Sequence, residues 1–592
     1  MTTPATPCAN WNTDGTTCPD TGKFTCGNCH LVAYWGPECQ KSHWSTHKAK
    51  CKSALDKANW SPDWFVQGRQ SAFVGEDNTQ EKFVGSKYLW GNVPALDILR
   101  LEANEGKDYN KKLNLLFAAS GDIRNVIKTI SQLPGSHDKP LHITINDIDF
   151  DIVARNVIML LIALTAEDQD AAIDCIIHVW YSAFIRKSDL DIIQQRVRPL
   201  IADICEEHKG KPADGSIFTK WEFGRRSLKI DLQKSAWDKL LLFTEVPEGL
   251  TTEKANKIRK ATTLAESRKD YRDRHFLFLS PFRRVAAQYF REDGILQPFG
   301  YQRAEFSEPN PTIFQEDVSV WPMRDNADPL DGWSAEDVET TPYGPAKADI
   351  YGKLFLYLRS VLRAFLDRIA NLKVLFRLLP MDARLLPNHL TDGTFDRIEA
   401  SNITDSSYVG IDNTVIILAP LLREMQLNPH ATLITIFMNA VHEMMARGVY
   451  LPNPALDNGV TQRLHKYLPV KPPIRGTYDP QVVKLTSARN SVRYFDDYFD
   501  YFMTVFDFPQ VAKNAGAIIR EENTIVEKWP FRLKLQPGQP GAQEEFDRLM
   551  GGGVSGTERY VEWKTGPITL DAPDMSWSRA ALVMLANIQQ TG

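Results

Sequence analysis

The clearest pattern of hydrophobic and polar positions begins at residue 113. Leu113 to Ser120 (LNLLFAAS) is almost continuously apolar, which is typical of a strand buried on both faces. Gly121-Asp122 ends this run, and apolar residues then recur at helical spacing from Ile123 to Leu133. The pattern predicts a strand, a short loop and a helix.

A second apolar run, Leu141 to Asn146 (LHITIN), predicts a second buried strand. It ends at Asp147, and a strongly apolar helix is predicted over 150–164. Strand, loop, helix, strand, acid and helix together form one half of a doubly wound nucleotide-binding sheet. We therefore expect an α/β body of Rossmann type.

Long amphipathic patterns dominate residues 165–385 and indicate a large helical insertion. The predicted helices are 171–186, 189–208, 227–243, 252–273, 282–291 and 349–372. The α/β pattern resumes at Phe395, with a strand running into a polar loop near Asn402. Thr414 to Leu418 (TVIIL) reads as a further strand, and Leu433 to Arg447 as a buried helix.

These patterns divide the chain into five predicted segments. They are a small cysteine-rich domain (1–55), an aromatic-rich connector (56–111), a first α/β segment (112–164), the helical insertion (165–385), and a second α/β segment with C-terminal helices (386–592). The connector repeats Trp and Phe among polar residues, so we expect it to pack against a neighbouring domain.

A concentration of lysine and arginine lies between residues 254 and 274. Acidic residues such as Glu266 and Asp270 are interspersed with it. This mixture favours a solvated helix with paired charges over a nucleic-acid groove.

Composition narrows the function classes further. The 592-residue chain is 43% hydrophobic and carries a net charge of −5, which argues against a general nucleic-acid binder. The longest apolar run, 157–164, is far shorter than a membrane span, and the first residues carry no targeting signal. We expect a protein of the cytoplasm or the nucleus, with no membrane partner.

Six of the eight cysteines lie within the first 51 residues. Cys26 and Cys29 have the two-residue gap that places two thiolates on one tetrahedral zinc ion. His47 and Cys51 are four residues apart and project from one face of a helix. The alternative, a disulfide knot, requires an oxidising compartment. The spacing predicts a closed, structural Zn²⁺ site that replaces a hydrophobic core too small to fold alone.

The run from Cys39-Gln40 through Trp44, His47 and Cys51 resembles the MYND-type zinc finger, a cross-braced module with two zinc ions. The resemblance implies a second zinc site formed by Cys8, Cys18 and Cys39. The family's fourth ligand of that site falls at Trp35, which cannot bind a metal. Either His30 or His43 substitutes, or water completes the shell, or the site is weak or empty.

MYND fingers commonly bind short proline-containing peptides. The resemblance assigns the peptide groove to Gln40 and to Trp44, whose ring would form an aromatic wall for a proline. The alternative role for Trp44 is packing within the finger, and the two roles are compatible.

The α/β body resembles class I methyltransferases. The resemblance assigns Ser120, Gly121 and Asp122 to the loop that contacts S-adenosylmethionine, and Asp147 to the ribose hydroxyls. The loop departs from the family because it has one glycine where two or three are usual. The alternative interpretation is an ordinary strand that ends in a polar turn.

Beyond the finger, residues 56–592 contain the segments WGNVPALDILRLEANEG, LNLLFAASGDIRNVIKTI, LHITINDIDFDIVARNVIMLLIAL and FDRIEASNITD. Through these segments the layout resembles fungal MYND-finger proteins with a large uncharacterised C-terminal domain, itself distantly similar to dynein-arm assembly factors. We expect a protein that acts through protein–protein interaction, as an adaptor, regulator or assembly factor, with a degenerate methyltransferase-like body and no catalytic residues. The alternative hypothesis is an S-adenosylmethionine-dependent methyltransferase.

Overall fold

The computed structural model describes residues 6–11, 16–74, 85–315, 319–448 and 454–566. Short parts of the predicted finger and connector lie outside these ranges. The end of the predicted C-terminal segment, 567–592, lies outside them too.

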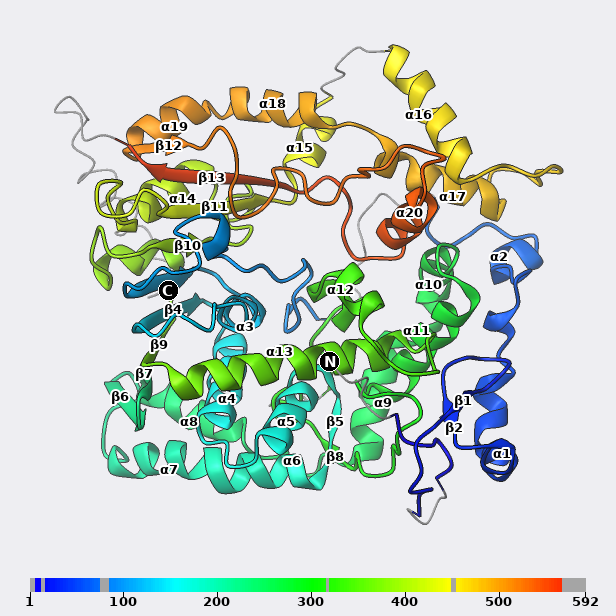
Figure 1. The fold of residues 1–592 in the computed structure, drawn as a ribbon, viewed down its shortest axis with the longest axis horizontal. Coiled ribbons are helices and arrows are strands. Elements are labelled where there is room, and N and C mark those ends of the chain that lie inside the picture. Colours follow the sequence, from blue (N-terminus) through cyan, green and yellow to red (C-terminus); the bar gives the residue numbers. More distant parts are fainter. Residues whose placement is uncertain (1–5, 12–15, 75–84, 316–318, 449–453, 567–592) are drawn as a thin grey trace.

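A nine-stranded sheet forms the centre of the body, in the order β12-β13-β11-β10-β3-β4-β9-β7-β6 (Figure 1). Neighbouring strands from β11 to β7 are parallel, whereas β12, β13 and β6 each pair antiparallel. The strands are β3 (Leu113–Phe117), β4 (Leu141–Asp147), β6 (Ser216–Phe223), β7 (Arg226–Gln233), β9 (Val374–Pro380), β10 (Arg397–Glu399), β11 (Thr432–Phe437), β12 (Ala517–Ile519) and β13 (Arg559–Thr565).

The strand order is that of a doubly wound sheet. Counting from β3 and leaving aside the β6–β7 hairpin, the parallel strands stand in the order third, second, first, fourth, fifth. The chain direction across the sheet therefore reverses between β3 and β10. In sheets of this kind ligands bind at the carboxyl ends of the strands beside that reversal, which we call the switch point.

Both faces of the sheet are covered, as the continuous apolar run of β3 requires. Leu115 and Phe117 belong to the core on one face, and Leu116 and Ala118 to the core on the other. The first core is closed by α3 (Arg124–Ser131), α4 (Phe150–Leu164), α5 (Gln169–Tyr181) and α13 (Ile350–Asn371). The second is closed by α14 (Ile411–Leu418), α15 (Ala440–Ala446), α18 (Asp496–Val505) and α19 (Phe508–Asn514).

The remaining elements surround this core. The helices are α1 (Pro37–Cys51), α2 (Asp63–Val66), α6 (Lys187–Ile192), α7 (Arg198–Glu207), α8 (Lys234–Leu242), α9 (Thr252–Thr263), α10 (Lys269–Phe276), α11 (Pro281–Asp293), α12 (Ala335–Thr340), α16 (Pro454–Tyr467), α17 (Pro480–Ala488) and α20 (Ala542–Met550). The short strands are β1 (Phe24–Thr25), β2 (Ala33–Tyr34), β5 (Phe184–Ile185) and β8 (Glu308–Pro309).

The finger is formed by β1, β2 and α1. It lies beside α11, at the end of the molecule opposite β6 (Figure 1). The prediction of a finger followed by a mixed α/β body with a large central sheet is therefore confirmed. Within the described residues, every helix is too short or too polar to cross a bilayer.

The interpretation of 165–385 as a large helical insertion is incomplete, because the stretch also contains strands. This stretch supplies β6, β7 and β9 to the central sheet. The helix predicted over 227–243 begins as strand β7, and only Lys234–Leu242 is helical. Buried and exposed positions alternate along β6, which is the period of a half-buried strand and not of a helix.

Two further assignments are corrected in the second α/β segment. The apolar run from Thr414 to Leu418 belongs to helix α14, because packing between the sheet and α19 overrides the strand preference of its branched residues. The stretch from Leu433 to Arg447 is strand β11 followed by helix α15, with a break at Met438-Asn439.

Candidate metal centre and sheet crevice

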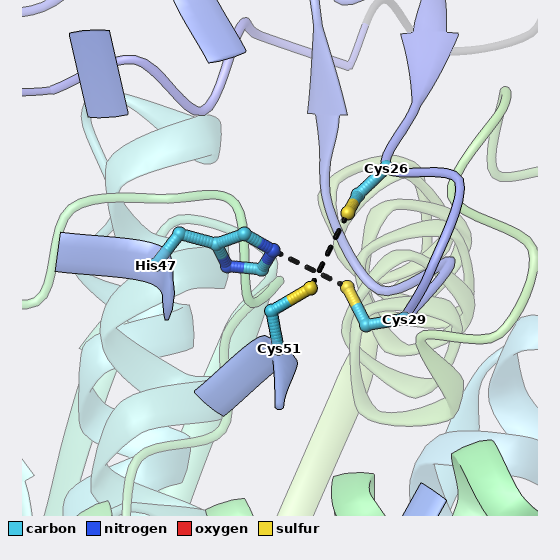
Figure 2. Close-up of side chains that lie close together, drawn as sticks. All are labelled: Cys26, Cys29, His47 and Cys51. Atoms are coloured by element: carbon cyan, nitrogen blue, oxygen red, sulfur yellow. Dashed lines mark hydrogen bonds between the residues drawn. The ribbon is translucent and has the colours of Figure 1, made fainter. Parts of the chain in front are cut away.

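Four ligand side chains converge at the base of the finger. Cys26 and Cys29 come from the turn between β1 and β2, and His47 and Cys51 come from the last turns of α1. Figure 2 shows the three sulfur atoms and the imidazole pointing toward one another. All four side chains are buried, and their ligand atoms lie within 4.8 Å of one another.

The spacing of these atoms fits a tetrahedral zinc ion. Zn–S bonds of about 2.3 Å and Zn–N bonds of about 2.0–2.1 Å place neighbouring sulfurs about 3.8 Å apart and sulfur and nitrogen about 3.6 Å apart. The Sγ atoms of Cys26 and Cys51 are 3.6 Å apart, and the Sγ of Cys29 is 3.4 Å from the Nε2 of His47. The predicted zinc-binding group is confirmed.

The electrostatics of the cluster also favour a cation. A hydrogen bond from Cys29 lowers the pKa of Cys26 to about 3, and the same bond raises the pKa of Cys29. Burial raises the pKa of Cys51 to about 11. The protein thus gathers three sulfurs where only one is readily ionised without a metal, and a zinc ion stabilises all three as thiolates.

A second group contains Cys8, Cys18 and Cys39, whose sulfur atoms also lie within 4.8 Å of one another. Antiparallel pairing of Pro7 with Thr21 and of Trp11 with Thr17 brings the first two cysteines together. This pairing accommodates the unusually long gap between Cys8 and Cys18. These three sulfurs make a second zinc site possible.

The structure narrows the search for a fourth ligand. Trp35 contributes its backbone N–H, which lies 3.2 Å from the Sγ of Cys8, and no side-chain ligand. His43 is buried beside the first site, with its Nδ1 3.0 Å from the Tyr34 hydroxyl, and burial lowers its pKa to about 4. His30 packs its ring 5.0 Å from that of Phe282. Neither histidine belongs to the group of three cysteines.

Asp20, which the sequence pattern did not single out, brings a carboxylate near the second group, but like the two histidines it does not belong to that group. Its Oδ2 lies 3.7 Å from the Sγ of Cys18, and its backbone carbonyl accepts a hydrogen bond from the N–H of Cys8 at 2.9 Å. Zinc also accepts carboxylate oxygen as a ligand. Asp20 follows Cys18 by two residues in the sequence, whereas its contact with Cys8 depends on the pairing of residues 7–11 with 17–21.

Gln40 and Trp44 lie on α1, and both are half-buried. The Trp44 ring is 6.1 Å from the His47 ring in an edge-to-face arrangement, and the Lys52 ammonium lies 5.8 Å above it. The Gln40 amide donates to the Sγ of Cys26 at 3.7 Å. The metal site thus fixes both side chains while part of each remains accessible.

Several contacts attach the finger to the body. The Lys50 ammonium lies 3.4 Å above the Tyr289 ring of α11, and the Arg284 guanidinium donates to the carbonyls of Leu55 and Lys57 at 2.9 and 2.8 Å. The hydroxyl of Thr6 donates to the carbonyl of Tyr343 at 3.0 Å. The finger is therefore held against the body at α11.

In the sheet, Asp122 faces protein groups on every side. Its carboxylate accepts hydrogen bonds from the Gly91 N–H at 2.9 Å and the Trp180 indole at 3.2 Å, and it pairs with Arg124 at 2.7 Å. Trp90 is buried and donates to the Trp180 carbonyl at 2.6 Å. The connector therefore packs into the loop after β3, as its aromatic composition indicated.

Asp147 has internal partners too. Its carboxylate accepts the N–H of Gly121 at 2.8 Å and that of Asp149 at 2.9 Å, and burial raises its pKa. Ser120 donates its hydroxyl to the Gly121 carbonyl at 3.2 Å. The four residues assigned to S-adenosylmethionine are thus brought together, but they bind one another and their neighbours.

A very small cavity lies at the carboxyl end of β10, beside the switch point, and the four residues assigned to S-adenosylmethionine are not among those that line it. Its volume is about 20 Å³, enough for roughly one water molecule, whereas pockets for cofactor-sized ligands measure roughly 300–1,000 Å³. Asn92, Val93 and Pro94 of the connector line it opposite Glu399 at the end of β10. Glu399 is buried, which raises the pKa of its carboxyl.

Comparisons with known proteins agree with the finger and extend the description of the body. A family model described as MYND finger matches residues 15–51, so Cys8 lies outside the matched range. A domain of unknown function, DUF4470, matches residues 89–185, which include β3, β4 and the connector segment at the switch point. No solved structure matches the chain significantly.

A curated relative aligns with part of the chain. Dynein axonemal assembly factor 3 from Danio rerio is 32% identical over 80 residues, which are 14% of this chain and 16% of that protein. The chain therefore spans about a sixth of the length of the relative that it matches.

Proposed function

We propose that this protein acts through protein–protein interaction, as an adaptor or assembly factor, with its zinc finger as the binding module. The observation that carries the proposal is the contrast between a complete four-ligand metal site and a cavity of about 20 Å³ at the switch point. A zinc ion with four protein ligands has no open position for a substrate, so its role is structural. What the finger offers is a rigid surface.

The peptide groove proposed for that surface contains Gln40 and Trp44. A half-buried tryptophan held at a fixed angle provides the flat wall against which a proline ring packs. Because α1 is anchored through His47 and Cys51, this wall loses little conformational entropy on binding. A proline-containing peptide is therefore the proposed ligand of the finger.

An assembly role is supported by the partial similarity to dynein axonemal assembly factor 3. A compartment that keeps thiols reduced, the cytoplasm or the nucleus, suits a protein whose six N-terminal cysteines stand at zinc sites. All eight cysteines lie within the described residues, and all are free thiols.

The body is proposed to be a methyltransferase-like framework without the activity. The doubly wound strand order supports the fold. Ala119 and Ser401 adopt left-handed backbone conformations, with φ of 49° and 46°, at the carboxyl ends of the two switch-point strands. Strained residues cluster at binding sites, so their presence supports descent from a protein with a ligand there. No observation favours a working methyltransferase.

The second zinc ion is proposed to be held by Cys8, Cys18, Cys39 and Asp20. Asp20→Asn should lower the zinc content toward one ion per chain, as measured by elemental analysis under reducing conditions. Adding Trp35→Cys to that variant restores the usual family ligand and should return the content to two. An unchanged content of two in Asp20→Asn alone would mean that another group completes the site.

Peptide binding is tested on the full-length, zinc-loaded protein by fluorescence polarisation against a library of proline-rich peptides. Trp44→Ala should weaken binding about tenfold or more, the loss expected for an aromatic anchor. Trp35→Ala is the matched control, because Trp35 is an exposed tryptophan of the same finger. Equal losses in both variants, or no binding to any peptide, would contradict the groove, provided that zinc content shows the finger to be folded.

A further inference from the structure

A large cavity separates the helices beside the finger from the C-terminal helices. Its volume is about 970 Å³, and α10, α11, α17 and α20 contribute to its walls. It lies apart from both the metal centre and the switch point. Its size falls in the range of sites that hold small molecules.

Arginine dominates the charge of this cavity, which we call the arginine cavity. Seven arginines and one lysine line it, against six carboxylates. Three of the arginines have acidic partners: Arg268 pairs with Asp325 at 3.0 Å, and Arg283 and Arg548 share Glu339 at 3.9 and 2.9 Å. These pairs account for less than half of the positive charge.

The other four arginines bind neutral oxygen atoms. Arg272 donates to the Ala265 carbonyl at 2.7 Å, and Arg274 to the Ser487 hydroxyl at 3.2 Å. Arg284 and Arg291 donate to backbone carbonyls as well. Within the described part of the chain, none of the four forms an ion pair with a carboxylate. A carbonyl satisfies a guanidinium hydrogen bond but leaves its charge uncompensated.

The surroundings make this uncompensated charge costly. Burial lowers the pKa of Arg272, Arg284 and Lys484, and burial followed by the charge of Arg291 lowers the pKa of His275 to about 4. Burial and the neighbouring Asp328 raise the pKa of Asp331 well above its usual value, which weakens its contribution of negative charge to the cavity. Desolvated like charges destabilise a fold unless a counter-charge binds.

The sequence favoured a solvent-exposed environment for these arginines. The basic stretch 254–274 was expected to be a solvated helix, and this is wrong for several of its residues. Arg259 is buried and donates to the carbonyls of Arg291 and Glu292, whereas Arg268, Arg272 and Arg274 line the cavity. Packing of α10 against α11 places Arg268 and Arg272 at the cavity, whereas Lys254, Lys257 and Arg274 remain exposed.

We propose that the arginine cavity binds a polyphosphorylated small molecule. Guanidinium groups are the preferred partners of phosphate because their paired N–H donors match two phosphate oxygens. Four arginines without carboxylate partners suit a ligand with several phosphate groups better than a single anion. A nucleoside polyphosphate and an inositol polyphosphate share this chemistry, and both match the volume of the site.

The test uses the full-length, zinc-loaded protein with ATP and inositol hexakisphosphate as probes and sodium sulfate at equal ionic strength as the control. Calorimetry should give saturable one-to-one binding of at least one phosphate probe in the micromolar range, and the melting temperature should rise with its concentration. Tighter binding of ATP would indicate a nucleoside polyphosphate as the ligand, and tighter binding of inositol hexakisphosphate would indicate an inositol polyphosphate. Saturation by neither probe would overturn the proposal, as would an equal response to sulfate.

The double variant Arg272→Gln/Arg291→Gln locates the site. Binding should weaken roughly 100-fold, because each lost charged hydrogen bond weakens it about tenfold or more. Without ligand, the variant should melt at the same or a higher temperature, since removing repelling charges relieves the free protein. A purely structural role for these arginines predicts a lower melting temperature.

Arg225→Gln is the matched control, an exposed arginine that donates to the carbonyl of Asn371 near the far edge of the sheet. Should the double variant fail to fold, Lys484→Gln tests the same site, since its ammonium lies over the Phe278 ring and forms no ion pair with a carboxylate of the described residues. If a folded double variant or Lys484→Gln variant binds the phosphate probe with unchanged affinity, the ligand does not bind in the arginine cavity. Tighter binding of an oligoglutamate peptide than of either phosphate probe contradicts the ligand class.

Discussion

The metal centre of the finger and the switch-point crevice of the sheet both gather polar side chains at the ends of strands. In the finger, the four ligands point at one common position and are spaced for an ion. In the crevice, Asp122 and Asp147 instead bind the backbone and side chains of their own neighbours. Suitable residues at suitable places are therefore not sufficient for a site. What distinguishes the two regions is whether the polar atoms still need a partner.

The largest effect is expected from removing a metal ligand. Cys29→Ala should reduce the zinc content by one ion per chain and unfold the finger, because zinc contributes on the order of 10–16 kcal/mol to small finger peptides. Protease digestion should then cut within residues 16–55 and leave the sheet protected. Retention of full zinc content would contradict the assignment of this ligand.

The second largest effect is expected on the free energy of unfolding when Asp122, in the loop after β3, is replaced. Asp122→Ala should lower the free energy of unfolding by about 3–5 kcal/mol, because it leaves the Arg124 guanidinium buried without its partner. Denaturant unfolding provides the measurement. Glu222→Ala removes one carboxylate of an exposed ion pair with Lys220 and should leave the free energy of unfolding almost unchanged. Similar losses in the two variants would show that Asp122 does not hold the crevice closed.

A smaller effect should appear in the pH dependence of stability. Asp405, in the loop after β10, accepts the N–H groups of Met438 and Asn439, and burial raises its pKa to about 6. Because the folded state then binds a proton more tightly than the unfolded state, stability is lost as pH rises from about 4 through about 6.

Asp405→Asn should remove this component, worth up to about 3 kcal/mol for roughly two pKa units. The measurement is the free energy of unfolding of the variant and the parent protein at pH 5 and pH 7.5. Asp214→Asn, at an exposed position, is the control. If the difference between the parent and Asp405→Asn is the same at both pH values, the carboxyl is not held in this environment.

The two regions also differ in how far their sequences predict them. The ligands Cys26, Cys29, His47 and Cys51 lie within a short stretch, and their spacing depends on one turn and one helix, so the pattern predicts the zinc-binding group. Strands β3 and β4 were equally visible, because both faces of each are buried. The grouping of Cys8 with Cys18 and Asp20 was not visible, because it depends on the pairing of two irregular segments.

The errors in the body have a common physical cause. Thr414 to Leu418 has the branched residues of a strand, and packing against the second core makes it a helix. The filling of the crevice depends on contacts such as that of Gly91 with Asp122, across some 30 residues, and of Trp180 with Asp122, across nearly 60. Periodicity describes which face of an element is apolar, but it does not indicate which distant segment covers that face.

The most direct test of the account is calorimetry of the full-length, zinc-loaded protein with S-adenosylmethionine. A closed crevice predicts no binding, or a dissociation constant weaker than about 100 µM, equivalent to roughly −5.5 kcal/mol. The Asp147 carboxylate is buried and already accepts the Gly121 N–H, so a ribose hydroxyl can reach it only if the loop after β3 moves. Micromolar binding that is abolished by Asp147→Ala would contradict the account and make the body a working cofactor site.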